Sequence, residues 1–183
     1  MGMSQSEING GVRDSPPGAL ATGRILPEFS LPAVSGGSIR NSDYRGRSNL
    51  VVIVADDRPQ TSGLMQALAD SYALIKTEAA EVLAIVALSP EQARERFGNL
   101  PYPVLVDADG RVQQRLGAIT AQGQAAAALY VTDAFGEIQL VHRTREGQTL
   151  PAASEVVTLL EFINIQCPEC EPPEWPLIKP DEF

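Results

Sequence analysis

Asn49-Leu-Val-Val-Ile-Val-Ala55 is the stretch that decides the fold, together with the loop Asp56-Asp-Arg-Pro-Gln60 that follows it. An apolar, β-branched run of this length is typical of a central strand buried on both faces of a parallel sheet. Apolar residues then recur at helical spacing, which predicts a helix over 62–79 with Thr61 or Ser62 as its N-cap. Enzymes of several classes place a nucleophile or bind an anion where a strand runs into a helix N-terminus.

Further strands and helices follow along the chain. Residues 81–88 are almost wholly apolar and predict a second buried strand, so that 49–88 forms a βαβ unit. Later patterns predict a helix over 90–97 capped by Ser89, a strand over 103–107, a helical piece over 112–116, a hairpin of 129–131 with 138–142, and a last helix from 150 to 163. The sequence therefore predicts an α/β domain with a central mixed β-sheet flanked by helices.

Composition divides the chain into three parts. Residues 1–22 are polar with little periodicity and predict a disordered N-terminal tail. Residues 23–165 carry the periodic segments of the domain, and residues 166–183 form a Pro-rich C-terminal tail with a Cys-Pro-Glu-Cys motif. The whole chain of 183 residues suits one globular domain.

Charge and hydropathy exclude several classes of partner. The formal net charge is −9 at pH 7, which argues against nucleic acid and anionic membranes. No apolar run approaches the length of a membrane span, and the N-terminus lacks the layout of a signal peptide. The expectation is a cytoplasmic protein.

Several segments resemble the peroxiredoxin-like (AhpC/TSA, redoxin) branch of the thioredoxin-fold superfamily. They are Leu26-Pro-Glu-Phe-Ser-Leu-Pro32, Ser42-Asp-Tyr-Arg-Gly46, Tyr102-Pro-Val-Leu-Val-Asp107 and the hairpin from Ala128 to Ile138. These motifs stand in the family's order, and the similarity covers roughly residues 23–165. The resemblance implies a thioredoxin-like fold and thiol-dependent peroxide reduction.

The family's catalytic residue is missing from the expected place. In the family, the buried strand leads to a Thr-Pro-x-Cys loop whose cysteine, at the helix N-terminus, attacks peroxide. This chain reads Thr61-Ser-Gly-Leu64, so Leu64 is expected at the position of the peroxidatic cysteine. The family's second-site arginine, or the cis-proline of the thioredoxin branch, would align near Ala127. The resemblance therefore predicts the fold, while these residues contradict the usual chemistry.

Thr61, Ser62 and Gly63 are a candidate ligand-binding site. A helix N-terminus offers several N–H donors to a negative group, which favours an anion or small molecule there. The alternative is a plain helix cap. A hydroxyl cannot replace the missing thiol, because no histidine or lysine stands near in sequence to activate it.

Cys167 and Cys170 form the most specific motif of the sequence, and they are the candidate catalytic or metal-ligating residues. Their CxxC spacing suits a redox disulfide, cycling with a thioredoxin-like partner, or shared coordination of zinc. One such turn supplies two of the four ligands that zinc takes, so a second copy in a homodimer would complete the site. The third alternative is a pair of reduced thiols in a docked tail, which Trp175 would anchor.

Other polar residues are expected to be structural. Asp56, Asp57 and Arg58 form a charged loop at a strand end, and such loops are usually solvated. His142 is the only histidine and has no partner motif.

Two functions remain open from the sequence. The first is a thiol-disulfide oxidoreductase or antioxidant protein of this family, without a peroxidatic cysteine at Leu64, whose redox chemistry falls to Cys167 and Cys170. The second is a non-enzymatic binding or scaffold module with a structural zinc knuckle or a dimer contact in its tail. Fold alone does not separate them.

Overall fold

The computed structural model describes residues 20–120, 123–144 and 149–166. Its elements follow the chain in the order β1 (Ser30–Pro32), β2 (Ser38–Arg40), the 3-10 helix η1 (Asn41–Tyr44), β3 (Asn49–Ala55), α1 (Pro59–Asp70), α2 (Tyr72–Thr77), β4 (Ala80–Val86), α3 (Pro90–Phe97), β5 (Val104–Val106), α4 (Arg111–Leu116), β6 (Ala128–Thr132), β7 (Ile138–Arg143) and α5 (Ala153–Ile165).

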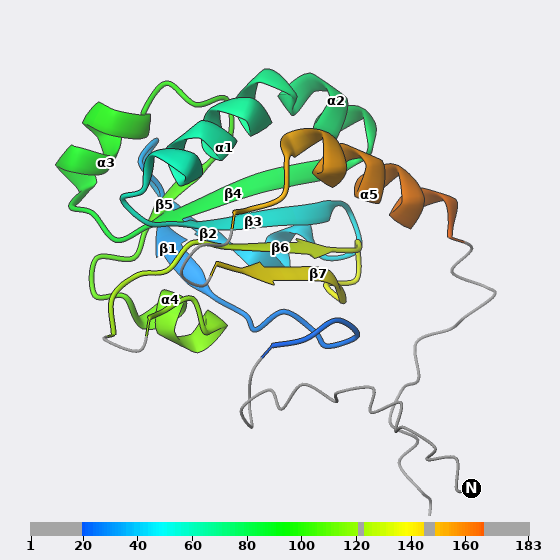
Figure 1. The fold of residues 1–183 in the computed structure, drawn as a ribbon, viewed down its shortest axis with the longest axis horizontal. Coiled ribbons are helices and arrows are strands. Elements are labelled where there is room, and N and C mark those ends of the chain that lie inside the picture. The colour runs from blue at the N-terminus through cyan, green and yellow to red at the C-terminus, as the bar shows by residue number, and fades with distance from the viewer. Residues whose placement is uncertain (1–19, 121–122, 145–148, 167–183) are drawn as a thin grey trace, which may run out of the picture.

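A mixed sheet in the order β5-β4-β3-β6-β7 forms the centre of the molecule (Figure 1). β3 pairs in parallel with β4 from Asn49 to Ala55 and in antiparallel with β6 on its other side. β5 is parallel to β4, and β7 is antiparallel to β6. β1 and β2 form a separate antiparallel hairpin. The predicted α/β architecture with a central mixed sheet is confirmed.

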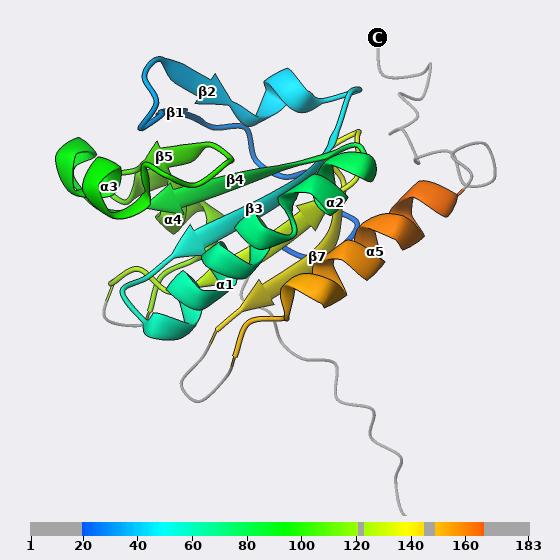
Figure 2. The same ribbon diagram turned by 90° about the horizontal axis from the view of Figure 1, so that it is seen from above.

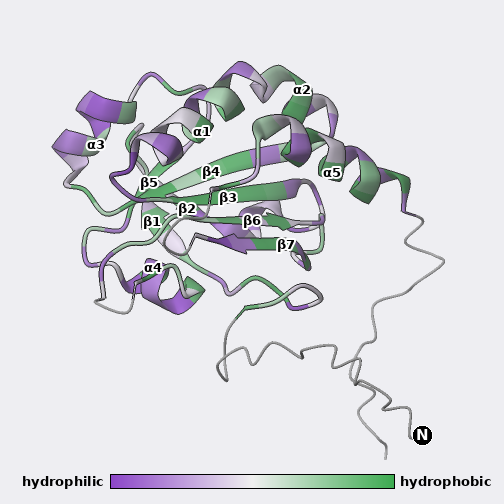
Figure 3. Ribbon diagram, viewed as in Figure 1, coloured by the Kyte–Doolittle hydropathy of each residue, from purple (hydrophilic) through white to green (hydrophobic). Residues whose placement is uncertain are grey.

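Both faces of the sheet are covered, which explains why β3 has no polar face. Val51 and Ile53 belong to a core shared with α1, α2 and α5, while Leu50 and Val52 belong to a second core that includes α4. Figure 2 shows α1, α2 and α5 lying together along the sheet. Colouring by hydropathy marks most of β3 and β4 as hydrophobic (Figure 3). The uninterrupted apolar run is therefore the signature of a strand with a core on each side.

The predicted helix over 62–79 is wrong in its start and in its continuity. α1 begins at Pro59, because proline at the first helical position lacks only an N–H that would have no helical acceptor there. The helical path breaks at Ser71, and α2 then ends at Thr77. Ile75 of α2 is fully buried in the same core as the apolar residues of α1.

Other local predictions hold more closely. The predicted cap of α3 is confirmed, since the Gln92 N–H donates to Ser89 Oγ at 3.3 Å and the Ser89 N–H donates to Gln92 Oε1 at 3.1 Å. The hairpin of β6 and β7 is also confirmed, and the N–H groups of Phe135 and Glu137 donate to Asp133 Oδ1 in its turn.

Leu20, which lies in the predicted N-terminal tail, contacts the folded body. Arg143 Nη2 donates to the carbonyl of Leu20 at 3.0 Å, and the Leu20 side chain packs on the core that includes α4. The rest of the two predicted tails, residues 1–19 and 167–183, lies outside the described residues. Among the helices that the structure describes, none is long and apolar enough to cross a bilayer.

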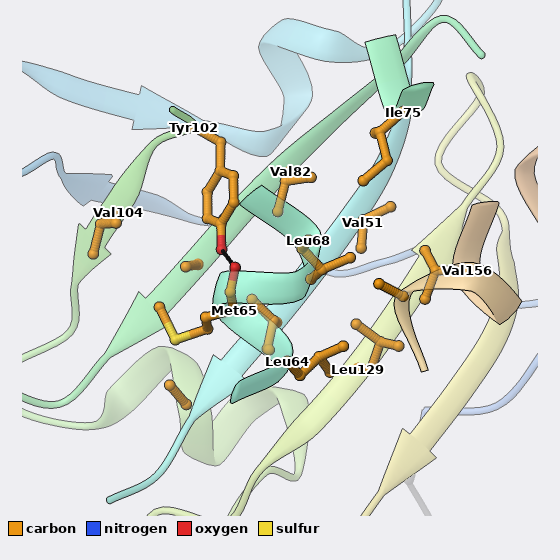
Figure 4. Close-up of a cluster of buried hydrophobic side chains, with 14 of the residues drawn as sticks. Val51, Leu64, Met65, Leu68, Ile75, Val82, Tyr102, Val104, Leu129 and Val156 are labelled. Atoms are coloured by element: carbon orange, nitrogen blue, oxygen red, sulfur yellow. Dashed lines mark hydrogen bonds between the residues drawn. The ribbon is translucent and has the colours of Figure 1, made fainter. Parts of the chain in front are cut away.

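We expect Leu68→Ala to lower the free energy of unfolding by about 2–5 kcal/mol, because Leu68 is fully buried between α1 and the sheet (Figure 4). Leu74→Ala is the matched control: Leu74 is 59% exposed, and its loss should cost less than about 0.5 kcal/mol. Urea unfolding of both variants measures the difference. Equal losses would contradict the described packing of α1.

Candidate functional site

The carboxylate of Asp56 is the centre of the candidate site. Asp56 follows the last residue of β3, and its Oδ1 accepts from the Arg58 N–H at 3.2 Å and from the Thr61 hydroxyl at 2.6 Å. Its Oδ2 accepts from Arg58 Nε at 2.5 Å and from the Ala127 N–H at 3.2 Å. One side chain thus joins the end of β3, the first turn of α1 and the residue before β6.

Local sequence explains this geometry. An aspartate that accepts from the N–H two residues onward forms an Asx turn, which directs the chain from β3 into Pro59. The positive end of the α1 dipole favours a carboxylate at this point. Thr61, in the first turn of the helix, then places its hydroxyl against the same oxygen that accepts from Arg58 N–H.

The surroundings of Asp56 favour its ionised form. Burial alone raises the pKa of Asp56, since only 9% of its side chain is exposed. Hydrogen bonds from Thr61 and Arg58, and the positive charge of Arg58, more than offset burial and hold the pKa below its ordinary value. The group therefore stays a carboxylate at neutral pH and is a weak base.

Arg58 extends the network to the end of β7. Its Nη2 donates to the Thr144 hydroxyl, and both the Thr144 N–H and the Thr144 hydroxyl donate to the Ala127 carbonyl at 2.9 Å. Ala127 itself is fully buried. The family's arginine was expected near Ala127, and Arg58, from the loop after β3, is linked to the Ala127 carbonyl through the Thr144 hydroxyl.

The predicted ligand-binding residues lie inside α1 and not at its cap. Arg58 is the N-cap, and the N–H groups of Thr61 and Ser62 both donate to its carbonyl. Thr61 is 1% exposed, and its hydroxyl is committed to Asp56. The cap assignment is therefore wrong, because Pro59 and not Thr61 opens the helix. Anion binding at Thr61, Ser62 and Gly63 stays a prediction.

Leu64 lies in the second turn of α1 and faces the core. It is 7% exposed, and Figure 4 shows it on α1 among the buried side chains, with Leu68 on the same helix. The expectation that Leu64 stands at the helix N-terminus is wrong for the same reason as the cap assignment. A side chain at this position contacts the core and does not open into the site.

The charged loop divides into a buried and an exposed aspartate. Asp57 is 88% exposed and pairs with Arg96 at 3.2 Å, as expected of a solvated loop. Asp56 contradicts that expectation. The signal that was available is the spacing of Asp56, Arg58 and Thr61, which fits an Asx turn that leads into a helix.

The remaining predicted residues do not join this site. His142 lies on β7 opposite Leu129, and no contact of the described residues connects it to Asp56. Cys167 and Cys170 lie outside the described residues, so their catalytic and metal roles stay predictions. Within the described ranges, no group of three or more His, Cys, Asp or Glu side chains could hold a metal ion.

A cleft of about 800 Å³ opens beside the Asp56 network. Its walls come from the ends of β3 and β4, from α3 and from the segment before β6, and are lined by Ala55, Asp56, Asp57, Arg58, Val86, Ala87, Leu88, Arg96, Phe97, Thr120, Gln124, Ala125, Ala126 and Thr144. The volume is in the range of small-molecule sites, and carboxyl ends of strands are a common place for them.

One family model and two curated proteins match this chain. The AhpC/TSA family model matches residues 22–141. The chain is 31% identical over 98 residues to thiol-disulfide oxidoreductase ResA of Geobacillus kaustophilus, a match that covers 51% of this chain and 56% of that protein. It is 30% identical over 105 residues to peroxiredoxin bcp1 of Schizosaccharomyces pombe, covering 54% and 53%. The chain thus spans about half the length of these curated relatives.

The fold is similar to that of a solved peroxiredoxin-type protein. Mycobacterium tuberculosis AhpC superposes with a TM-score of 0.69 at 19% identity, and the match covers 83% of this chain and 98% of that one. At this identity the likeness shows the fold. The predicted thioredoxin-like fold of the peroxiredoxin type is thereby confirmed.

We expect Asp56→Asn to lower the free energy of unfolding by about 2–4 kcal/mol, because an amide cannot accept the bonds of all these donors and leaves the Arg58 charge uncompensated. Asp57→Asn, one residue away and exposed, should change it by less than about 0.5 kcal/mol. Urea unfolding at neutral pH separates the two. A small loss in both variants would show that Asp56 does not organise this region.

Proposed function

The chain belongs to the AhpC/TSA family, and from this premise we propose that it is a thiol-disulfide oxidoreductase whose exchange chemistry is carried by Cys167 and Cys170. The observation that supports the proposal is the hydrogen bond from the Thr61 hydroxyl to Asp56, in the first turn of α1, where the family's loop carries a thiol. Cys167 and Cys170 are the two cysteines of the sequence, so thiol chemistry depends on them.

Spacing from the proline supports Thr61, in place of Leu64, as the residue equivalent to the family's cysteine. In the family's Thr-Pro-x-Cys loop, the cysteine follows the proline by two residues. Pro59 is the first residue of α1, and Thr61 stands at the same spacing from it. Neither Thr61 nor Leu64 carries sulfur, so the proposal does not depend on which of them is equivalent.

The Thr61 hydroxyl is a poor substitute for a thiol. Asp56 would have to act as its base, but the lowered pKa of Asp56 makes it a weak one. Thr61 is also 1% exposed, which keeps substrates from its oxygen. The Thr61 hydroxyl in the first turn of α1 therefore serves as a hydrogen-bond donor and is poorly suited to nucleophilic attack.

The proposed reaction is thiol–disulfide exchange between the reduced Cys167–Cys170 pair and a substrate disulfide. One thiolate of the Cys167–Cys170 pair attacks a sulfur of the substrate disulfide and displaces the other sulfur as a thiolate. The second cysteine then attacks the mixed disulfide, which releases the reduced substrate and leaves a Cys167–Cys170 disulfide. A dithiol partner of the thioredoxin type restores the pair. A cytoplasmic setting would supply such a partner, and both remain predictions.

A second candidate function is a non-enzymatic binding or scaffold module. The Asp56 network favours it, because a fixed carboxylate with satisfied donors gives the cleft a defined shape without a reactive group. In that function, Cys167 and Cys170 serve as two zinc ligands or as a dimer contact, and a second copy of the chain supplies the other ligands.

Counting reactive thiols tests the two functions. For the oxidoreductase, the oxidised protein should show no reactive thiol and the reduced protein two, and only the reduced form should reduce a disulfide substrate. Cys167→Ser with Cys170→Ser should abolish this activity and leave the unfolding transition unchanged. The single-serine variant that keeps the attacking cysteine should accumulate the mixed disulfide, and the other single-serine variant should fail to form it.

Other outcomes overturn the proposal. Thiols that are blocked without oxidation and freed by a chelator would favour the scaffold with zinc. Two thiols that react freely in the untreated protein, with no turnover of a disulfide, would remove the redox and the zinc functions together. Peroxide consumption that survives in the double-serine variant would mean that a site at α1 without a thiol reduces peroxide. This result would contradict the proposal.

A further inference from the structure

The cleft beside α1 contains two arginines whose hydrogen bonds are only partly used. Arg58 donates to Asp56 through Nε and to Thr144 through Nη2. Among the described residues, no hydrogen bond or ion pair involves its Nη1. Arg96 donates from Nη1 to Asp57 and from Nη2 to the Ser62 hydroxyl, both at 3.2 Å. Each arginine side chain is 41% exposed. Both can therefore donate to a further acceptor.

The negative charges in the cleft do not stand in the way of an anion. Asp56 is buried and its charge is balanced by Arg58, so it acts as a positioning residue that holds the guanidinium in place. Asp57 contacts Arg96 from an exposed position, and such surface pairs contribute little to stability. A ligand can displace the Asp57 carboxylate at small cost.

Much of the remaining cleft wall is apolar, although Thr120, Gln124 and Thr144 also line it. Its wall includes Val86, Leu88 and Phe97, together with Ala125 and Ala126 before β6. The Arg96 guanidinium lies over the Phe97 ring, 5.0 Å from its centroid, so a charged group and an apolar surface are adjacent. Sites of this composition bind molecules with a charged end and an apolar body.

We propose that this cleft binds a small organic carboxylate, with the carboxylate on Arg96 and Arg58 and the apolar body against Phe97 and Leu88. The ligand exchanges one carboxylate for another on Arg96, because Asp57 already occupies that guanidinium with the same chemistry. A doubly charged phosphate fits less well, since the two arginines are already balanced by Asp56 and Asp57. The site differs from the predicted Thr61–Gly63 amides, because side chains supply the donors.

The proposal is independent of the thiol chemistry. Carboxylate binding requires Arg58, Arg96 and the cleft, whereas disulfide exchange requires Cys167 and Cys170. A variant that loses carboxylate binding still allows disulfide exchange to be measured, and the reverse also holds. The failure of one proposal can therefore be distinguished from the failure of the other.

Titration of isotope-labelled full-length protein with benzoate, followed by amide NMR at constant ionic strength, tests the site. Benzoate should shift the resonances of Ala125, Ala126 and Leu88 in a saturable way. Benzyl alcohol has the same ring without the charge and should give no saturable shift. Inorganic phosphate should bind at least about tenfold more weakly than benzoate, because one further charge lacks a partner.

Variants assign the binding to the named side chains. Arg96→Gln should weaken benzoate binding at least about tenfold through loss of a charge-assisted hydrogen bond. Asp57→Asn should tighten it about two- to fivefold, since the competing carboxylate is removed. Arg94→Gln is the matched control on the same helix: Arg94 donates to the Val34 carbonyl, does not line the cleft, and its loss should change nothing.

Several results would overturn the proposal. These are equal binding of benzyl alcohol, equal or tighter binding of phosphate, unchanged affinity in Arg96→Gln, and weaker or unchanged affinity in Asp57→Asn. The amide spectrum shows whether each variant is folded. Asp57 is exposed, so its variant keeps the test decisive if Arg96→Gln does not fold.

Discussion

The buried carboxylate of Asp56 is the interaction on which the candidate site depends. Four donors from three segments converge on it: the Arg58 N–H and Nε, the Thr61 hydroxyl and the Ala127 N–H. A carboxylate with so little exposure is costly unless such donors surround it, and each charge-assisted bond is stronger than a neutral one. The geometry at the strand end, the start of α1 and the position of Arg58 all follow from satisfying this one group.

This constraint separates the fold from the chemistry of the family. The sheet, the helices over its faces and the match to the AhpC/TSA model belong to the domain as a whole. The first turn of α1 has a hydroxyl that donates to a carboxylate, and the proposed thiol chemistry depends on Cys167 and Cys170 instead. A fold of this kind can keep its cleft and lose its thiol, because packing and catalysis depend on different residues.

The sequence predicts the sheet better than the site. β3 (Asn49–Ala55) and β4 (Ala80–Val86, expected at 81–88) have apolar residues on both faces, and this composition is visible without knowledge of their neighbours. The Asp56 network is different, since its Ala127 donor lies 71 residues away and approaches only because β6 pairs with β3. The start of α1 does not follow from the sequence pattern, because proline is common both in loops and at the first position of a helix. Cys167 and Cys170 lie outside the described residues.

The pKa of the Asp56 carboxyl, followed by carbon-13 NMR as the pH is lowered, tests the central claim most directly. Its donors should hold this pKa below the ordinary aspartate value of about 3.9. A lowered pKa means that Asp56 contributes stability above the unfolded-state pKa and that this contribution is lost as the pH falls through the folded-state value. A pKa of Asp56 at or above the ordinary aspartate value would contradict the account, because its donors would then not stabilise the charged form.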